Sequence, residues 1–196
     1  SYAMRCLGSD ADGVADLLDD FVSGMREGGL SVTLKTFPGI GNVSADVTES
    51  IAENTDSLMT IRDTNFVPYA SGIQAGADCV MVSNAAYSKL TVKKVPAFMS
   101  QDIVTKLLRE ELGFDGIVMT SPLNDNVIEN NYTNEFAVVE AVKAGCDLIV
   151  LPGNFKECYE ALITAVEEGR IDEKVINTSV RRILQNKIQR GILVLE

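Results

Sequence analysis

The sequence predicts an α/β fold in which parallel strands alternate with helices along the chain. Two observations support this prediction. Stretches with helical spacing of apolar residues alternate with short apolar runs throughout the 196 residues. The short runs are apolar on both faces, which is typical of parallel strands covered by helices. There are four of them, at 31–37, 78–82, 116–120 and 147–151.

Such a sheet belongs either to a doubly wound fold or to a (β/α)8 barrel. Four strand–helix units are too few to close a barrel of eight strands, so a small open sheet or part of a barrel is expected. The length and the hydrophobic content of 46% are enough for one domain with a substantial core. We expect residues 1–3 to be a cloning remnant and residues 4–196 to form this single domain.

The amino-terminal part of the chain predicts a helix, a strand and a long polar loop. Apolar residues recur at helical spacing over 10–26, a serine and an aspartate stand where they can cap the start, and Gly28-Gly29 ends the helix. The strand 31–37 follows, and the polar loop extends to about residue 54.

The middle of the chain predicts two more helix–strand pairs. A helix over 56–75 precedes the buried strand 78–82, and a helix over 101–111 precedes the strand 116–120. Each of these helices is followed by a glycine, which is a typical helix stop.

The carboxyl-terminal part predicts a helix over 134–143 that stops at Gly145, then the strand 147–151. Two further helices, over 154–168 and 172–190, complete the chain.

Composition and charge exclude several classes of partner. The net charge is −11, which disfavours nucleic acid and anionic membranes because both require clustered lysine and arginine. There is no apolar run near the length of a membrane span and no signal peptide pattern. Cys79 and Cys146 lie in apolar runs and are expected to be buried free thiols, which favours a cytoplasmic location.

Polar residues follow each predicted strand, where parallel α/β folds bind their ligands. Lys35 precedes a glycine-rich loop, and its amine suits either a hydroxyl-rich or anionic substrate or a Schiff base; a surface lysine is the alternative. Asp46 lies in that loop as a candidate proton donor, or as a solvated or capping residue. Ser121 and Asp125 follow the strand 116–120.

The sequence contains no histidine, and this absence limits the possible chemistry. Ser121 has no histidine to activate it, so a Ser-His-Asp mechanism is not possible. Without histidines or paired cysteines, no tight zinc site is predicted, and we expect neither a metal nor a cofactor.

Several long motifs resemble glycoside hydrolase family 3, in its β-N-acetylhexosaminidase type. The loop after the first strand is similar to the family's K-H-F-P-G-H-G-D stretch with its following Asp-x-His pair, and the strands near 80 and 118 lie in stretches similar to family motifs. The segments that carry the resemblance are RCLGSDADGVADLLDDFVSGMREGG (5–29), LKTFPGIGNVSADVT (34–48), AGADCVMVSNAAYSKL (75–90), VPAFMSQDIVTKLLREELGFDGIVMTSPL (95–123), AVKAGCDLIVLPG (141–153) and INTSVRRILQNKI (176–188).

The resemblance implies a retaining glycosidase, and the catalytic positions depart from it. Ser121 occupies the position of the carboxylate nucleophile, and a hydroxyl without a base cannot replace an anion there. In this subgroup an Asp-His pair supplies the acid and base; Asp46 is kept, but Thr48 stands in place of the histidine.

The sugar-binding positions that the resemblance implies are partly changed. Thr36 and Asn84 replace two substrate-binding histidines, whereas Arg5 and Lys35 are retained as residues that hold sugar hydroxyls. No cofactor is implied.

The resemblance starts at the middle of the family's catalytic domain, so it implies the carboxyl-terminal half of a TIM (β/α)8 barrel. A half barrel leaves two open sheet edges, which predicts a homodimer or pairing with a missing amino-terminal half.

Three functions follow from these departures. The first is an inactive relative that remains a carbohydrate-binding or oligomerising module. The second is an active glycosidase that uses Asp46 and Asp125 in shifted roles. The third is a Schiff-base aldolase that uses Lys35, since that lysine ends a strand as in class I aldolases.

Overall fold

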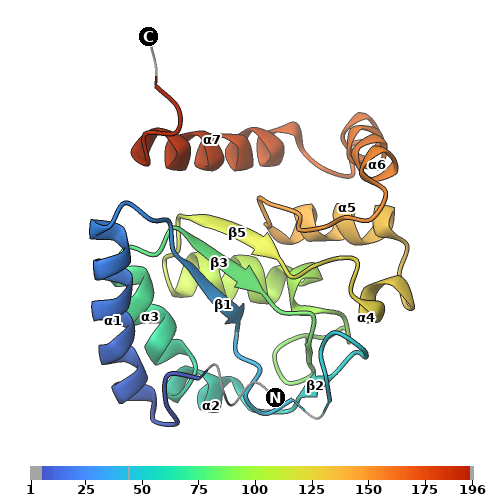
Figure 1. Cartoon of the computed structure of the whole chain (residues 1–196). Coiled ribbons are helices and arrows are strands. Elements are labelled where there is room, and N and C mark those ends of the chain that lie inside the picture. Colours follow the sequence, from blue (N-terminus) through green and yellow to red (C-terminus); the bar gives the residue numbers. More distant parts are fainter. Residues whose placement is uncertain (1–5, 44, 195–196) are drawn as a thin grey trace.

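The computed structural model describes residues 6–43 and 45–194, and its centre is a parallel three-stranded sheet (Figure 1). The strand order is β1 (Thr33–Phe37), β3 (Cys79–Val82) and β5 (Ile117–Thr120). Leu148 adds a single parallel bridge to Met119 on the outer side of β5. The predicted α/β class with parallel strands is confirmed, and the sheet is open, as expected for part of a barrel.

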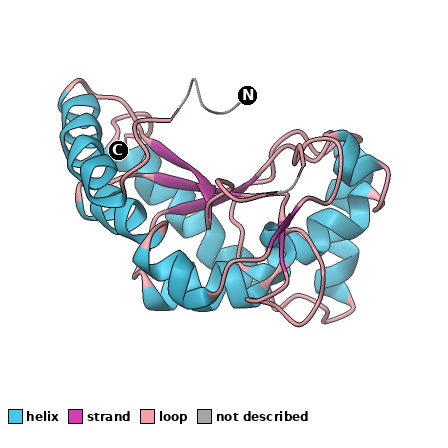
Figure 2. Cartoon of the chain, turned by 90° about the horizontal axis from the view of Figure 1, so that it is seen from below, coloured by secondary structure: helices cyan, strands magenta, loops and turns pink. Residues whose placement is uncertain are grey.

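Helices lie in an arc around one side of the strands, as Figure 2 shows. Helix α1 (Ala11–Glu27) packs along α3 (Phe66–Gln74), and α5 (Asn134–Ala144) packs along α6 (Phe155–Glu167). Between these pairs runs η3 (Asp102–Glu111), a helix with wide π-type turns, which follows the short η2 (Ala97–Met99). Within the described ranges, no helix is both long and apolar enough to cross a membrane.

Three of the four predicted strands form, and their inward-facing side chains belong to the buried core. β1 pairs with β3 through Leu34 and Val80, and β3 pairs with β5 through Val80 and Val118. Those three side chains are at most 5% exposed. The register of β1 shifts between Lys35 and Phe37, just where the strand enters the glycine-rich loop.

A second, two-stranded sheet was missed by the sequence analysis. β2 (Glu53–Asn54) pairs in parallel with β4 (Ala86–Tyr87). Each strand has two residues, which is too short for any periodic pattern to be recognised. The short helix α4 (Asn126–Glu129) was missed for the same reason.

The single helix predicted over 56–75 is wrong, because the segment forms two helices. α2 (Leu58–Asp63) ends before α3 begins. In a continuous helix Pro68 would have to donate a hydrogen bond to the carbonyl of Thr64, but proline has no N–H and its ring clashes with that carbonyl. The side chain of Asn65, at the junction, donates to the Pro38 carbonyl at 2.9 Å.

The strand predicted over 147–151 is also wrong in extent, because only the bridge at Leu148 forms. The Val150 N–H donates to the hydroxyl of Thr120 at 3.1 Å, where a continuing ladder would use a backbone carbonyl. Leu151 then has a φ of 45°, which turns the chain out of the extended conformation.

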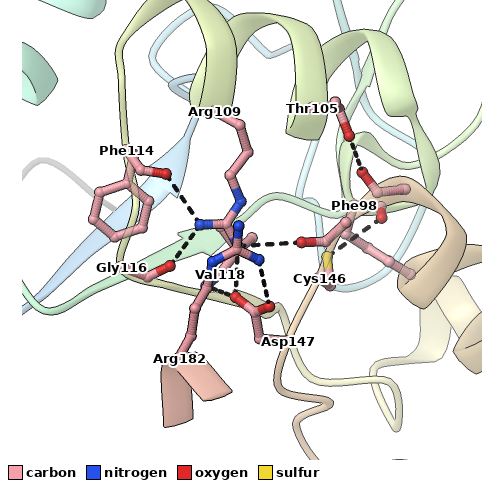
Figure 3. Close-up of polar contacts among 11 residues, drawn as sticks. Phe98, Thr105, Arg109, Phe114, Gly116, Val118, Cys146, Asp147 and Arg182 are labelled. Atoms are coloured by element: carbon pink, nitrogen blue, oxygen red, sulfur yellow. Dashed lines mark hydrogen bonds and ion pairs between the residues drawn. The ribbon is translucent and has the colours of Figure 1, made fainter. Parts of the chain in front are cut away.

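Helix α7 (Glu173–Gln189) is fixed across the amino ends of the strands by two buried carboxylates. Asp147 accepts from Arg109 at 2.5 Å and from Arg182 of α7 at 3.2 Å, as Figure 3 shows. Asp78 accepts from Arg190, which follows α7, at 2.5 Å.

Both carboxylates also bind the sheet itself. The Val118 N–H donates to Asp147 at 2.9 Å, and the Val32 N–H donates to Asp78 at 2.9 Å. Burial raises the pKa of Asp78, but the bonds from Arg190 and the Val32 N–H outweigh it, and the net pKa is lowered. Each aspartate therefore joins a strand start to α7.

Candidate active site

A cavity of about 970 Å³ opens at the carboxyl ends of β1, β3 and β5. It brings together six residues singled out from the sequence, although up to 90 positions separate them along the chain. The lining includes Lys35, Thr36, Asp46, Asn84, Ser121 and Asp125, together with Thr48. Arg5, the remaining candidate, lies outside the described residues. The clustering supports the expectation that strand ends form one site, while the role of each residue stays a prediction.

The glycine-rich loop that lines the cavity is held in place from three other elements. Tyr87 of β4 donates to the Gly39 carbonyl at 2.8 Å, and Asn65 donates to the Pro38 carbonyl at 2.9 Å. Farther along the loop, the Thr48 carbonyl accepts from the Val127 N–H of α4 at 2.9 Å. These bonds define the shape of one wall of the cavity.

Gly39 is the position in this loop where only glycine fits. Its φ is 117°, and a Cβ built there would lie 1.9 Å from the Nδ2 atom of Asn65. Any side chain would displace Asn65 and break its bond to the Pro38 carbonyl. The sequence signal was the Pro-Gly pair, but its partner Asn65 was not identifiable from spacing.

Asp46 is fixed as an anion by its neighbour Thr48. Its Oδ1 accepts from the Thr48 N–H at 2.9 Å and from the Thr48 hydroxyl at 2.7 Å. The backbone bond, followed by the hydroxyl bond, lowers the pKa of Asp46. A carboxylate with a lowered pKa holds its proton poorly, so this arrangement opposes a role as general acid near neutral pH.

Ser121 is oriented away from nucleophilic chemistry. Its side chain is buried, and its Oγ donates to the Val82 carbonyl at 2.9 Å. A hydroxyl proton that is bound to a carbonyl is not shared with a base, and the chain has no histidine. The serine acts structurally, since it joins the end of β5 to the end of β3.

Asp125 and Asn84 form the remaining polar pair of the cavity. The Nδ2 of Asn84 donates to Asp125 at 2.9 Å. Burial raises the pKa of Asp125, the negative charges of Asp46 and Glu49 raise it further, and the Asn84 bond opposes them. Of the described carboxyls that line the cavity, Asp125 is the one whose pKa shift favours holding a proton.

Lys35 lies on the exposed side of β1, opposite Met81 of β3. The Schiff-base hypothesis requires a buried amine. The exposed position does not supply that burial, so the geometry favours a role in binding over covalent catalysis.

Several lining residues were not singled out from the sequence. Tyr69 comes from α3, and Met81 and Pro122 come from strand ends, so the cavity has apolar as well as polar walls. No part of the described chain gathers three or more histidine, cysteine, aspartate or glutamate side chains in a group that could hold a metal ion.

An open parallel sheet with a polar cavity at the strand ends is the arrangement of α/β proteins that bind ligands at the carboxyl ends of their strands. Comparison with known proteins identifies the family to which the domain belongs. The model of the glycosyl hydrolase family 3 N terminal domain matches residues 1–186, and the chain belongs to this family. The resemblance found in the sequence is therefore confirmed, and the family is one of hydrolases.

Named relatives agree with this assignment. A beta-hexosaminidase of Stenotrophomonas maltophilia is 32% identical over 189 residues, which cover 96% of this chain and 53% of the relative. A beta-hexosaminidase of Xylella fastidiosa is 32% identical over 147 residues, which cover 75% of this chain and 43% of the relative. The chain thus spans about half the length of the relatives it matches, or less.

A solved structure shows the same fold. A glycoside hydrolase family 3 beta-N-acetylglucosaminidase from a Paenibacillus species superposes with a TM-score of 0.92 and 33% identity. The superposition covers 98% of this chain and 38% of that chain.

Proposed function

We propose that this chain binds a neutral sugar in the cavity at the strand ends and does not cleave glycosidic bonds. It is a family 3 domain in which the sugar-binding wall is kept in part, at Lys35, and the hydrolytic groups are replaced. The ligand class comes from the relatives, which are named for hexosaminidase and N-acetylglucosaminidase activity. A cavity of about 970 Å³ is large enough for one or two sugar rings.

The observation that carries this proposal is the bond from Ser121 Oγ to the Val82 carbonyl at 2.9 Å. Retaining hydrolysis requires a carboxylate on one side of the anomeric carbon and a proton donor on the other. Ser121 offers no negative charge, and Asp46 is an anion that accepts both Thr48 donors. The two requirements fail at separate residues, so a change at one residue does not restore the mechanism.

A second function is favoured by one observation, the raised pKa of Asp125. A raised pKa favours the protonated carboxyl that a general acid requires, and Asp46, as an anion, would then stand in the shifted second role. This alternative makes the chain an active glycosidase with both carboxylates in new positions.

Nitrophenyl N-acetylglucosaminide separates the two functions. We expect no release of nitrophenol above the rate in buffer from wild type or from Asp125→Asn, because no residue supplies the nucleophile. Turnover by wild type that Asp125→Asn abolishes would establish the alternative. The control variant is Asp115→Asn, which changes a carboxylate outside the cavity.

We also propose that the chain associates with a second copy of itself. The outer edges of β1 and of the Leu148 bridge are open in the described sheet. One face of α6 exposes three apolar side chains at helical spacing, with Phe155 72% exposed, and one face of α7 exposes three more. They are Phe155, Tyr159 and Ile163 on α6, and Val180, Leu184 and Ile188 on α7.

Light scattering after size exclusion tests the association. We expect a dimer whose share of the protein falls on dilution, and we expect Phe155→Asp with Leu184→Asp to give a monomer. A wild-type monomer at every concentration would contradict this proposal without affecting the proposal on sugar binding.

A further inference from the structure

We propose that Asn84 is the residue that selects the ligand, because its Oδ1 accepts a hydrogen bond from one hydroxyl or amide N–H of the bound sugar while Asp125 fixes the orientation of the amide. This inference rests on the proposed function and specifies which atom of the cavity distinguishes one sugar from another by a hydrogen bond.

The first support is the burial of an acceptor without a partner. Asn84 lines the cavity and is 1% exposed. Its Oδ1 has no hydrogen-bond partner among the residues that the structure describes. A buried polar atom that stays unpaired costs free energy, so such an atom in the wall of a cavity indicates a place for a ligand donor.

The second support is the way in which the amide is oriented. Nδ2 of Asn84 donates to Oδ2 of Asp125 at 2.9 Å. Because Oδ2 of Asp125 accepts this bond, the NH₂ group of Asn84 faces Asp125, and the amide carbonyl oxygen is the end left for a ligand. Asp125 is therefore a positioning residue that acts through Asn84.

The third support is the position of the pair in the fold. Asn84 comes two residues after β3, and Asp125 is the residue directly before α4, after β5. Ser121 lies between them in the sequence and holds the ends of these strands together through Val82. The pair therefore stands on the rigid part of the site, which suits a residue that discriminates between ligands.

The charges of the cavity indicate the kind of ligand. Among the described lining residues, the charged side chains are Lys35, Asp46 and Asp125. Two carboxyls and one amine disfavour an anionic sugar, and an oxygen acceptor requires a donor from the ligand. A neutral sugar with free hydroxyls or an acetamido N–H fits both conditions.

The test uses N-acetylglucosamine and its monodeoxy analogues, with affinities measured by titration calorimetry or NMR. In wild type, we expect removal of one particular donor from the sugar to weaken binding about tenfold, because Oδ1 is then left unpaired in the complex. In Asn84→Leu, the parent sugar should bind about tenfold more weakly, and removal of that same donor should cost nothing further.

Asp125 variants test positioning. Asp125→Ala leaves the amide free to turn, and the discrimination between the parent sugar and the deoxy analogue should be lost. Asp125→Asn keeps a carbonyl oxygen that can accept from Nδ2, and it should restore the discrimination. A merely structural role for Asp125 would change affinity for both sugars alike and leave their ratio unchanged.

Asn186→Leu is the matched control. The Nδ2 of Asn186 also donates to a buried carboxylate, that of Asp78 at 3.0 Å, but at the opposite edge of the sheet. This variant should keep the affinity and the discrimination of wild type.

The outcomes are distinct. If wild type binds N-acetylglucosamine and Asn84→Leu discriminates between the analogues as wild type does, the inference is overturned and the proposed function stands. If folded wild type binds none of these sugars, both are overturned.

Discussion

Asp147→Ala is expected to lower the free energy of unfolding by about 3–5 kcal/mol. The side chain of Asp147 is fully buried and accepts from Arg109, from Arg182 and from the Val118 N–H (Figure 3). Arg109 is only 10% exposed, so the variant leaves a guanidinium almost without water and without its counter-ion. Loss of one partner from a buried pair is far more costly than loss of the pair as a whole.

Urea unfolding followed by circular dichroism measures this effect. The control is Glu160→Ala, which removes the exposed partner of Lys156 on α6 at 3.7 Å and should change stability by less than about 0.5 kcal/mol. Similar stabilities of Asp147→Ala and Glu160→Ala would show that the buried cluster does not hold α7 on the strands.

Phe37→Ala is expected to have the second large effect, and it should lower the free energy of unfolding by about 3–5 kcal/mol. The ring is fully buried at the end of β1, where it stacks on Phe66 at 5.5 Å and meets the edge of Tyr69 at 5.1 Å. Alanine leaves a cavity between β1 and α3. Because Pro38 and Gly39 follow directly and Tyr69 lines the site, the variant should also loosen the glycine-rich loop.

Chemical denaturation gives the stability of this variant, and hydrogen exchange of the Gly39 amide reports on the loop. Phe136→Ala is the matched control, since its ring also stacks on another aromatic, Tyr132 at 5.9 Å, but is 51% exposed. Phe136→Ala should lower the free energy of unfolding by less than about 1 kcal/mol. Equal losses from the two variants would contradict the account of the core at β1.

Sequence patterns predicted those helices and strands whose structure is decided by residues close to them along the chain. Strands β3 and β5 have continuous apolar runs and pair as expected. The helix predicted over 56–75 failed because the apolar spacing runs through the break at Thr64 and Asn65, where Pro68 has no N–H for the Thr64 carbonyl. The strand predicted over 147–151 failed because a side chain, the Thr120 hydroxyl, takes the bond that a strand ladder needs.

The candidate site was predictable at the level of residues and not at the level of contacts. Asn84 and Asp125 each follow a predicted strand, and parallel strands end at the same edge of the sheet, so both residues were expected at that edge. Their hydrogen bond joins residues 41 positions apart and depends on the orientation of two side chains, which no local pattern records. The bond between Asp78 and Arg190 spans 112 positions and was missed for the same reason.

Proton NMR of the protein mixed with an unlabelled β-glycoside of N-acetylglucosamine tests the central claim most directly, because one sample reports both binding and cleavage. We expect shifts in the amide resonances of Asn84, Ser121 and Asp125, together with an anomeric signal of the intact glycoside that stays constant over days. Growth of free N-acetylglucosamine at a rate proportional to protein concentration would contradict that claim.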